Sequence, residues 1–420
     1  MNRALRCVVY SLLLMVVGMG SLALISGCSS GTTSTSSGGA GGTGGTGSTW
    51  TGGGDGIWRR NAVYAEASGF DPCNAHPQQQ GQYHYHDNPV CLRYQEGDNI
   101  TGANVGTLTA TYTETTGTPV HSPLLGFAYD GNPVYGPYGY GTATNSGSAV
   151  RRMVSSYALR TDNTTTRTSL PGWAAVAQGF STTMATYALT STQYGPPVST
   201  TYPQGRYIED YQYTAGSGDL DQYNGRYCVT PEFPSGTYAY FITIDSTGKP
   251  AFPYYIGLQY YGTVGGSSVT SISESTTSYF ANHAMVGSSS SVPEVNKWYT
   301  ANSAVYAQYQ NSAGTKSTTW TGQTSAVYAD IQAIAYSASY VYVTMSGLAS
   351  HIMGPFSGNP NLPLNQNLIV KLPLTESSTA ATTHSQTTGG ANGVWVNGVA
   401  MFNMEDFFSW SYASQADVGN

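Results

Sequence analysis

The chain has 420 residues, a formal net charge of −7 and only 9% Asp, Glu, Lys and Arg. This low and acidic charge excludes a nucleic-acid binder, which needs clustered cations to neutralise phosphates. Glycine (51) and tyrosine (34) are abundant, and they favour strands joined by turns, because tyrosine suits the half-buried face of a pleated sheet. The charged residues that cover helices are scarce, so the composition predicts an all-β protein.

The N-terminus has the pattern of an export signal. Two arginines precede an apolar run over residues 7–25, and two small residues and Cys28 follow it. This ending resembles a bacterial lipobox, and it predicts a signal peptide over residues 1–27 that is cleaved before a lipid-bearing Cys28. We therefore expect an exported protein that is anchored in the cell envelope, and Ser29 favours the outer membrane. An uncleaved membrane anchor is the alternative, because the run approaches the roughly 20 residues that cross a bilayer.

A linker follows the signal. Residues 28–55 are almost wholly Gly, Ser, Thr and Ala, a composition that cannot bury a core. It predicts a flexible tether with a root-mean-square reach of roughly 30 Å.

Three cysteines lie beyond the linker: Cys73, Cys91 and Cys228. Outside the cytoplasm two of them are expected to form a disulfide. The pair Cys73 and Cys91 is favoured because both flank one short segment, and closing that loop stabilises by roughly 3 kcal/mol. A bridge from Cys73 to Cys228 is the alternative.

Two pairs of segments repeat each other along the chain. Phe70 to His86 is echoed by Leu220 to Phe241, where the alternating tyrosines persist and the histidines do not. Gly126 to Tyr135 is echoed by Gly393 to Phe402, with Asp-Gly or Asn-Gly between apolar residues. Such a dipeptide is the strongest short signal for a β-hairpin, typically with a type I′ turn. We expect a hairpin-rich sandwich or barrel-like domain built from two related halves.

Several ordered motifs resemble the YHYH-domain family over residues 56–262. They are Tyr83-His84-Tyr85-His86, Cys91-Leu92, Ser122-Pro123-Leu124-Leu125-Gly126-Phe127, Asp130-Gly131, Tyr135-Gly136-Pro137, Leu220-Asp221, Asn224-Gly225-Arg226, Pro231-Glu232, Gly236-Thr237-Tyr238 and Phe252-Pro253-Tyr254. The family has no established activity, so the resemblance implies a domain type and little chemistry.

The order of the segments departs from that family. In similar proteins the part that corresponds to residues 334–412 precedes the part that begins near Trp58, whereas here it follows. We hypothesise a circular permutation in which residues 301–420 pack on the same domain, after a Ser/Thr-rich connection over residues 263–300. Permutation is tolerated where native termini lie close together, so Trp58 and Tyr412 are expected to be neighbours.

The histidines of the YHYH motif are the candidate metal ligands. In a strand, His84 and His86 project from the same face, with Cα atoms roughly 6.5 to 7 Å apart. Together with His76 and His121, they could supply three or four neutral imidazoles, which suit zinc or copper rather than calcium or magnesium. The alternative is a structural role in cross-strand packing and hydrogen bonding.

A second functional hypothesis needs no catalysis. Rows of tyrosine offer rigid aromatic contact area, so the protein could be a surface module for a glycan or protein partner. The sequence contains no nucleophile elbow, phosphate-binding loop or dinucleotide fingerprint. The sequence therefore does not identify a reaction, a substrate or an oligomeric state.

Overall fold

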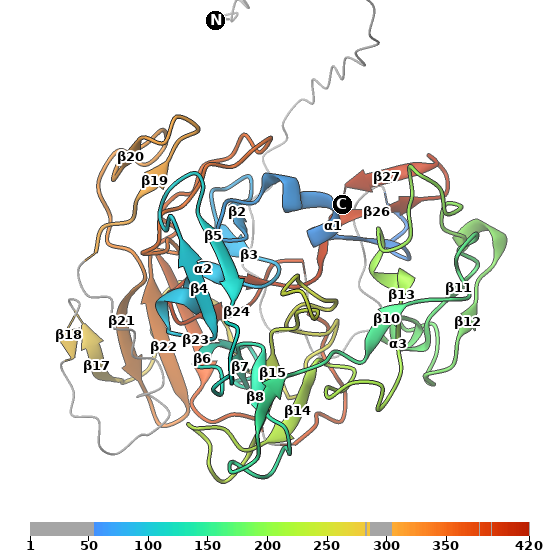
Figure 1. The fold of residues 1–420 in the computed structure, drawn as a ribbon, viewed down its shortest axis with the longest axis horizontal. Coiled ribbons are helices and arrows are strands. Elements are labelled where there is room, and N and C mark those ends of the chain that lie inside the picture. Colours follow the sequence, from blue (N-terminus) through green and yellow to red (C-terminus); the bar gives the residue numbers. More distant parts are fainter. Residues whose placement is uncertain (1–53, 282–283, 286–304, 378, 388, 420) are drawn as a thin grey trace, which may run out of the picture. The chain divides into compact units, whose positions relative to one another are not determined.

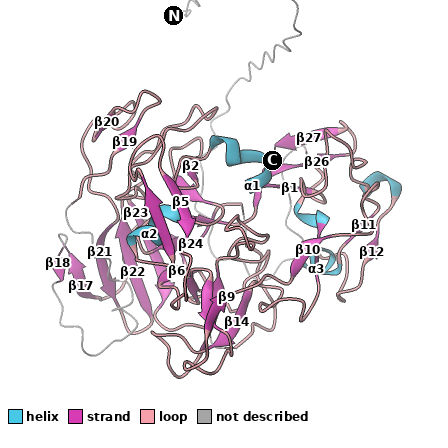
Figure 2. Cartoon of the chain, viewed as in Figure 1, coloured by secondary structure: helices cyan, strands magenta, loops and turns pink. Residues whose placement is uncertain are grey.

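The computed structural model describes residues 54–281, 284–285, 305–377, 379–387 and 389–419. Strands and loops dominate these residues (Figure 2), which confirms the expected all-β class, and the described sheets do not close into a barrel. The described helices are α1 (Ala62–Glu66), α2 (Val90–Gln95) and α3 (Gly172–Ala177), with 3-10 turns at Ala67–Gly69, Ser191–Gln193 and Ile208–Asp210. Within the described ranges, no helix has the length and apolar character needed to cross a membrane.

An eight-stranded sheet organises the molecule. Its order is β14 (Gly225–Cys228), β15 (Thr237–Phe241), β7 (Pro133–Tyr135), β6 (Leu124–Ala128), β24 (Ala391–Trp395), β25 (Ala400–Phe402), β3 (Tyr83–Tyr85) and β2 (Ala75–Pro77). The C-terminal hairpin β24–β25 therefore lies inside the sheet, between β6 and β3. Strands from both ends of the chain build one sheet.

The sheet consists of two related halves. The tyrosine half is β6, β7, β14 and β15, and the histidine half is β24, β25, β3 and β2. The halves meet where β6 pairs antiparallel with β24, with Phe127 opposite Val394. Each half has an inner hairpin at the centre of the sheet (β6–β7 or β24–β25) and an outer hairpin at its edge (β14–β15 or β2–β3). The two hairpins of a half pair in parallel, so that Val134 lies opposite Tyr240 and Met401 lies opposite Tyr85. The repeats in the sequence are therefore repeats in the fold.

Both predicted hairpins form, but with a different turn from the expected one. Gly131 and Gly398 have φ angles of 82° and 73°, while the preceding Asp130 and Asn397 do not adopt positive φ. Each glycine N–H donates to a carbonyl three residues earlier, at 2.9 Å and 2.8 Å. This is a type I turn followed by a left-handed residue, the common three-residue hairpin loop.

A second sheet of six strands shares the same buried core. Its order is β16 (Ser267–Val269), β23 (Leu368–Pro373), β22 (Tyr340–Met345), β21 (Ile331–Tyr336), β17 (Thr277–Ala281) and β18 (Ala284–Met285). Residues 263–300 were expected to be only a connection, but β16, β17 and β18 come from this segment. Phe280 of β17 pairs with the buried Ile334 of β21, which in turn lies opposite the buried Val343 of β22. This buried row outweighs the Ser/Thr-rich composition.

Smaller sheets complete the described fold. One has three strands, β1 (Arg59–Asn61), β26 (Glu405–Ser411) and β27 (Ala416–Gly419). The two-stranded ones are β4 (Ile100–Ala103) with β5 (Thr111–Glu114), β8 (Tyr138–Tyr140) with β9 (Val150–Arg152), β10 (Tyr157–Leu159) with β13 (Tyr211–Tyr213), β11 (Ser169–Leu170) with β12 (Tyr187–Ala188), and β19 (Tyr309–Gln310) with β20 (Lys316–Ser317).

Segments from opposite ends of the chain lie side by side at the three-stranded sheet. Figure 1 shows the blue β1 and α1 beside the red β26 and β27. The backbone N–H of Trp410 donates to the carbonyl of Trp58 at 2.9 Å, and the N–H of Tyr412 donates to the Asp55 carboxylate at 2.6 Å. The proximity expected of Trp58 and Tyr412 is compatible with permutation, which stays a prediction.

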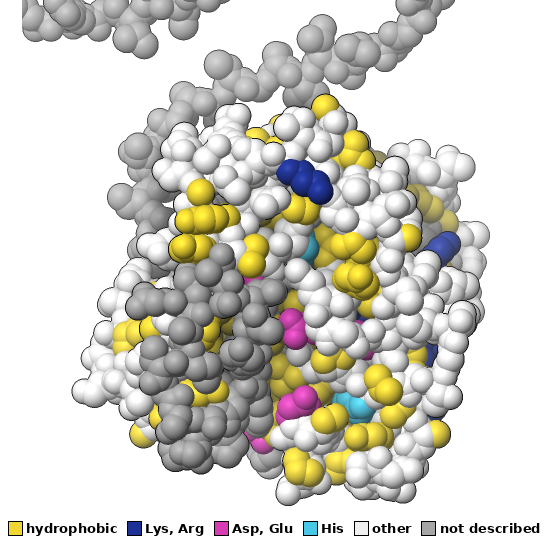
Figure 3. Space-filling view, turned by 60° about the vertical axis from the view of Figure 1, so that its left-hand side comes forward, with side chains coloured by type: hydrophobic (Ala, Val, Ile, Leu, Met, Phe, Trp, Pro, Cys, Tyr) yellow, Lys and Arg dark blue, Asp and Glu magenta, His cyan; other side chains and the backbone are white. Residues whose placement is uncertain are grey.

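Several of the few charged residues lie inside the protein. Arg93 pairs with Asp98 at 2.5 Å and Arg167 with Asp210 at 2.7 Å, and all four side chains are buried. The face drawn in Figure 3 is mostly neutral, with only scattered acidic and basic side chains. This face therefore offers little charge to attract a highly charged partner.

Candidate functional site

The hairpin β2–β3 brings the histidines of the YHYH motif to one face of the sheet. His76 and His84 are cross-strand partners, and strand alternation places His84 and His86 on the side opposite to the tyrosines. The connection between the strands turns at Gly81, whose φ of 78° favours glycine. Local sequence thus sets the positions of all three imidazoles.

The three side chains converge on one point. His84 Nε2 lies 3.0 Å from His86 Nε2, and one ligand atom from each of His76, His84 and His86 lies within 4.8 Å of the others. Glu66 joins them, because its Oε2 lies 3.2 Å from His86 Nε2 and 3.4 Å from His76 Nε2. Three nitrogens and one carboxylate oxygen therefore face a shared space.

Hydrogen bonds on the far side of the rings orient two of the imidazoles. The Nδ1 atom of His84 is 2.9 Å from the Gln82 carbonyl, and that of His86 is 2.7 Å from the Asn403 carbonyl. A carbonyl only accepts, so each Nδ1 carries the proton and donates it, which leaves the Nε2 lone pair for an ion. Phe402 stacks on His84 with ring centroids 3.9 Å apart and further fixes that ring.

The imidazole of His76 is held more loosely. Its Nδ1 lies 3.4 Å from the amide nitrogen of Asn359, and that amide also donates to the Pro77 carbonyl at 2.9 Å. Phe70 packs edge-on against the His76 ring with centroids 4.9 Å apart. Of the three clustered imidazoles, the ring of His76 therefore has the most freedom to move.

Burial and proximity shift the ionisation of the cluster. Burial, followed by the neighbouring His86 and His76 charges, lowers the pKa of His84 well below its usual value. Burial also lowers the pKa of His76. Burial opposes a charge on His86, but hydrogen bonding and attraction to Glu66 outweigh it and raise the pKa of His86. The pKa of Glu66 is lowered, because its bonds to His76 and His86 outweigh the effect of burial. The lowered pKa values of His76 and His84 favour neutral imidazoles, and the lowered pKa of Glu66 favours a carboxylate, which together suit a cation.

The cluster opens into a cleft of about 650 Å³. Glu66 and the three histidines line it together with Glu405, Asp406, Phe407 and several amide side chains. Burial raises the pKa of Asp406 to about 7, although Arg60 opposes this shift. A metal held here would have a face open to molecules from solution, as catalytic metal sites do.

Sequence reasoning missed Glu66. This residue ends α1, a helix that begins after Asn61, whose side chain accepts from the Tyr64 N–H at 3.4 Å. Glu66 belongs to no ligand-spacing motif, and only the tertiary placement of α1, which packs against β1 and β26, brings its carboxylate to His76 and His86. Its position upstream of the motif in a chain poor in carboxylates was the available signal.

The structure does not bring His121 to the cluster. Its ring packs against Tyr135, Tyr140 and Phe241, with centroids 5.3, 4.7 and 6.4 Å away. Phe241 is in β15, five strand positions from β3 in the sheet, which is roughly 24 Å at roughly 4.8 Å per step. The expectation that His121 joins the other three histidines is therefore wrong, because it belongs to the tyrosine half.

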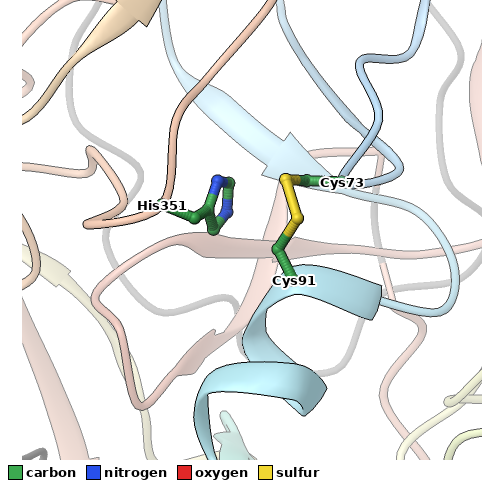
Figure 4. A group of neighbouring side chains, drawn as sticks. All are labelled: Cys73, Cys91 and His351. Carbon is green, nitrogen blue, oxygen red and sulfur yellow. A yellow bond between two sulfur atoms is a disulfide. The ribbon is translucent and has the colours of Figure 1, made fainter. Parts of the chain in front are cut away.

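The cysteines pair as the favoured alternative predicted. Cys73 and Cys91 form a disulfide, and Cys228 is a buried free thiol. Figure 4 shows His351 beside the disulfide, and one ring nitrogen and both sulfurs lie within 4.8 Å of one another. The predicted lipid-bearing Cys28, the signal peptide and nearly all of the linker lie outside the described residues.

Comparison with known proteins agrees with the motifs. The family model described as "YHYH protein" matches residues 28–253, which is more than half of the chain. No curated protein and no solved structure matches it. The match includes the hairpin with all three clustered histidines and the aspartate-tyrosine repeat of the other half. The chain therefore belongs to the YHYH protein family.

Proposed function

We propose that His76, His84 and His86, with the Glu66 carboxylate, bind one transition-metal ion, zinc or copper. One observation carries the proposal: the Nε2 atoms of His84 and His86 face each other at 3.0 Å. Both Nδ1 atoms donate to carbonyls, so two lone pairs would repel at this distance unless a cation lies between them. A proton can fill that role in the free protein, and a metal ion fills it with Glu66 as a further ligand.

The donor set favours these metals over others. Imidazole nitrogen suits zinc and copper, whereas calcium and magnesium prefer shells of oxygen atoms. When bound, such an ion could polarise a substrate or activate water. The residues of this chain would orient it, because the Gln82 and Asn403 carbonyls fix two imidazoles, and Phe402 and Phe70 shield the rings from water.

Elemental analysis tests metal binding. The parent, a His84→Ala/His86→Ala variant and a His121→Ala control are loaded separately with zinc and copper, desalted and analysed. We expect about one ion per chain in the parent and in the control, and less than a tenth of that in the double variant. Equal metal content in the parent and the double variant would contradict the proposal.

We also propose that a lipid on Cys28 anchors the protein in the cell envelope. The support is the apolar run that ends in two small residues and a cysteine. In a bacterial host, labelled fatty acid should enter the parent and not a Cys28→Ala variant. Equal labelling of both proteins would refute lipidation at this residue.

A second candidate function is glycan binding in the same cleft. Phe407 lines the cleft with 55% of its surface exposed, and its ring lies beside Gly389. Carboxylates and amides line the same cleft, and among the described residues no Lys or Arg lines it. An open aromatic ring among neutral and acidic hydrogen-bonding groups suits a neutral sugar better than an anionic one.

Calorimetry with soluble oligosaccharides tests this candidate. Neutral hexamers of glucose and of N-acetylglucosamine are compared with an anionic hexamer of galacturonic acid. We expect a neutral hexamer to bind at least 10-fold more weakly to Phe407→Ala than to the parent. Tyr227→Ala, which removes a ring of 48% exposure in the tyrosine half, should not change affinity. Failure of both neutral hexamers to bind would rule out this function.

A further inference from the structure

The Cys73–Cys91 disulfide encloses all of the histidine ligands. It joins residues 18 positions apart, and His76, His84 and His86 lie between them. Cys73 precedes β2 by two residues, and Cys91 is the second residue of α2. The bond therefore ties together the two ends of the segment that forms the metal-binding hairpin.

A second connection runs from the disulfide through His351 to the centre of the motif. His351 lies beside the two sulfurs (Figure 4), and its Nε2 is 2.5 Å from the hydroxyl of Tyr85. Tyr85 stands between His84 and His86, with its side chain on the opposite face of the strand. The ring of Tyr85 is fully buried, so a shift of His351 would disturb the strand that carries two ligands.

The neighbouring turn strengthens this connection. Asp71 accepts hydrogen bonds from the N–H groups of Cys73, at 2.9 Å, and of Gly354, at 2.9 Å. It also accepts one from the hydroxyl of Tyr83 at 2.7 Å. The loop that carries His351, the start of the disulfide-closed segment and the first tyrosine of the motif are thus held as one unit.

The disulfide has its own opening to solution. A cavity of about 300 Å³ is lined by Cys73, Cys91, His351, Tyr94 and Tyr112. It shares no lining residue with the cleft over the metal ligands. A small thiol could therefore reach the sulfurs without passing the metal.

We propose that this disulfide controls metal retention: a dithiol that reduces the Cys73–Cys91 bond releases the ion from the histidine cluster. The inference rests on the metal-binding function proposed above. A thiolate of the dithiol attacks one sulfur, and the other cysteine leaves as a thiolate. The second thiol of the reagent then closes its own disulfide, so that two electrons and two protons pass to Cys73 and Cys91. The opened segment no longer holds the three imidazoles at their converging positions.

The rate of metal transfer to a chromogenic chelator tests the proposal. The zinc-loaded parent is compared with a Cys73→Ala/Cys91→Ala variant and with Cys228→Ala, which removes the buried free thiol. We expect at least 10-fold faster release from the double variant and an unchanged rate from Cys228→Ala. Dithiol should accelerate release from the parent and not from the double variant, which separates reduction of the protein from chelation by the reagent.

A further variant keeps the test valid if the double variant folds poorly. Tyr85→Phe leaves the disulfide intact and removes only the hydroxyl, which contacts His351 and also accepts from the Asn397 amide at 3.4 Å. We expect about 3-fold faster release, with the melting temperature lowered by only a few degrees, as for the loss of one hydrogen bond. Parent-like release from Tyr85→Phe, with no acceleration of the parent by dithiol, overturns the proposal. A parent that takes up no zinc or copper refutes the metal site itself, which is a different outcome.

Discussion

In both halves of the eight-stranded sheet, an aspartate and a tyrosine hold the turn that leads into the outer hairpin. In the histidine half, Asp71 accepts from the Tyr83 hydroxyl at 2.7 Å, and in the tyrosine half Asp221 accepts from the Tyr238 hydroxyl at 2.8 Å. Each aspartate also accepts from backbone N–H groups of its own turn. The aspartate, the turn and the tyrosine are therefore the structural part of the motif.

The halves differ where the metal ligands would be. Arg226 and Ala239 are cross-strand partners at the positions that His76 and His84 occupy in the other half. Phe241 stands where the histidine half has His86, and it forms a buried strand end. Because the strand forms without imidazoles, the histidines are an addition to the structure, which is the pattern expected of functional residues.

The largest expected effect comes from removing the aspartate that both halves share. Asp71→Ala and Asp221→Ala each remove a buried carboxylate and leave several donors without an acceptor, so each should cost about 3 kcal/mol or more of unfolding free energy. Urea denaturation measures this cost. A loss below about 1 kcal/mol in either half would mean that the two turns are not equivalent supports.

The disulfide has no counterpart in the tyrosine half, so its removal should distinguish the halves. Cys73→Ala/Cys91→Ala should lower the unfolding free energy by about 3 kcal/mol, because the loop is no longer closed in the unfolded chain. Cys228→Ala deletes one buried sulfur and should cost about 1 kcal/mol. Similar losses in the two variants, measured by urea denaturation, would remove this distinction.

Zinc should raise the unfolding free energy of the protein only when the histidines of the histidine half are present. With zinc in 100-fold excess over its dissociation constant, the parent should gain about 2.7 kcal/mol, and a chelator should abolish the gain. His84→Ala/His86→Ala should respond to neither reagent in thermal unfolding. An equal response of that variant would place the stabilising metal elsewhere.

The smallest expected effect compares the two tyrosine hydroxyls. Tyr83→Phe and Tyr238→Phe should each cost about 1 kcal/mol, the usual net value of one hydrogen bond. Tyr238→Phe should cost slightly more, because Asp221 then keeps two backbone donors whereas Asp71 keeps three. Calorimetric unfolding of both variants gives the difference, and a larger loss from Tyr83→Phe would reverse this ranking.

Short-range patterns in the sequence predicted much of this protein. Strand alternation placed His84 and His86 on one face, and the Asp-Gly and Asn-Gly dipeptides marked both inner hairpins. The short spacing of Cys73 and Cys91 identified the disulfide. These features depend on backbone period, turn chemistry and loop length, which act over a few residues and can be read directly.

Only the tertiary structure decided which of these local pieces meet. It placed Glu66 beside the clustered histidines and His121 away from them, because such a cluster depends on which strands become neighbours and not on spacing along the chain. It also showed that each half joins two hairpins in the same spatial order, although the chain runs from the inner to the outer hairpin in the tyrosine half and in the opposite order in the histidine half. Burial of the shared core stabilises this spatial arrangement, and the buried contacts do not depend on the order in which the chain connects the hairpins.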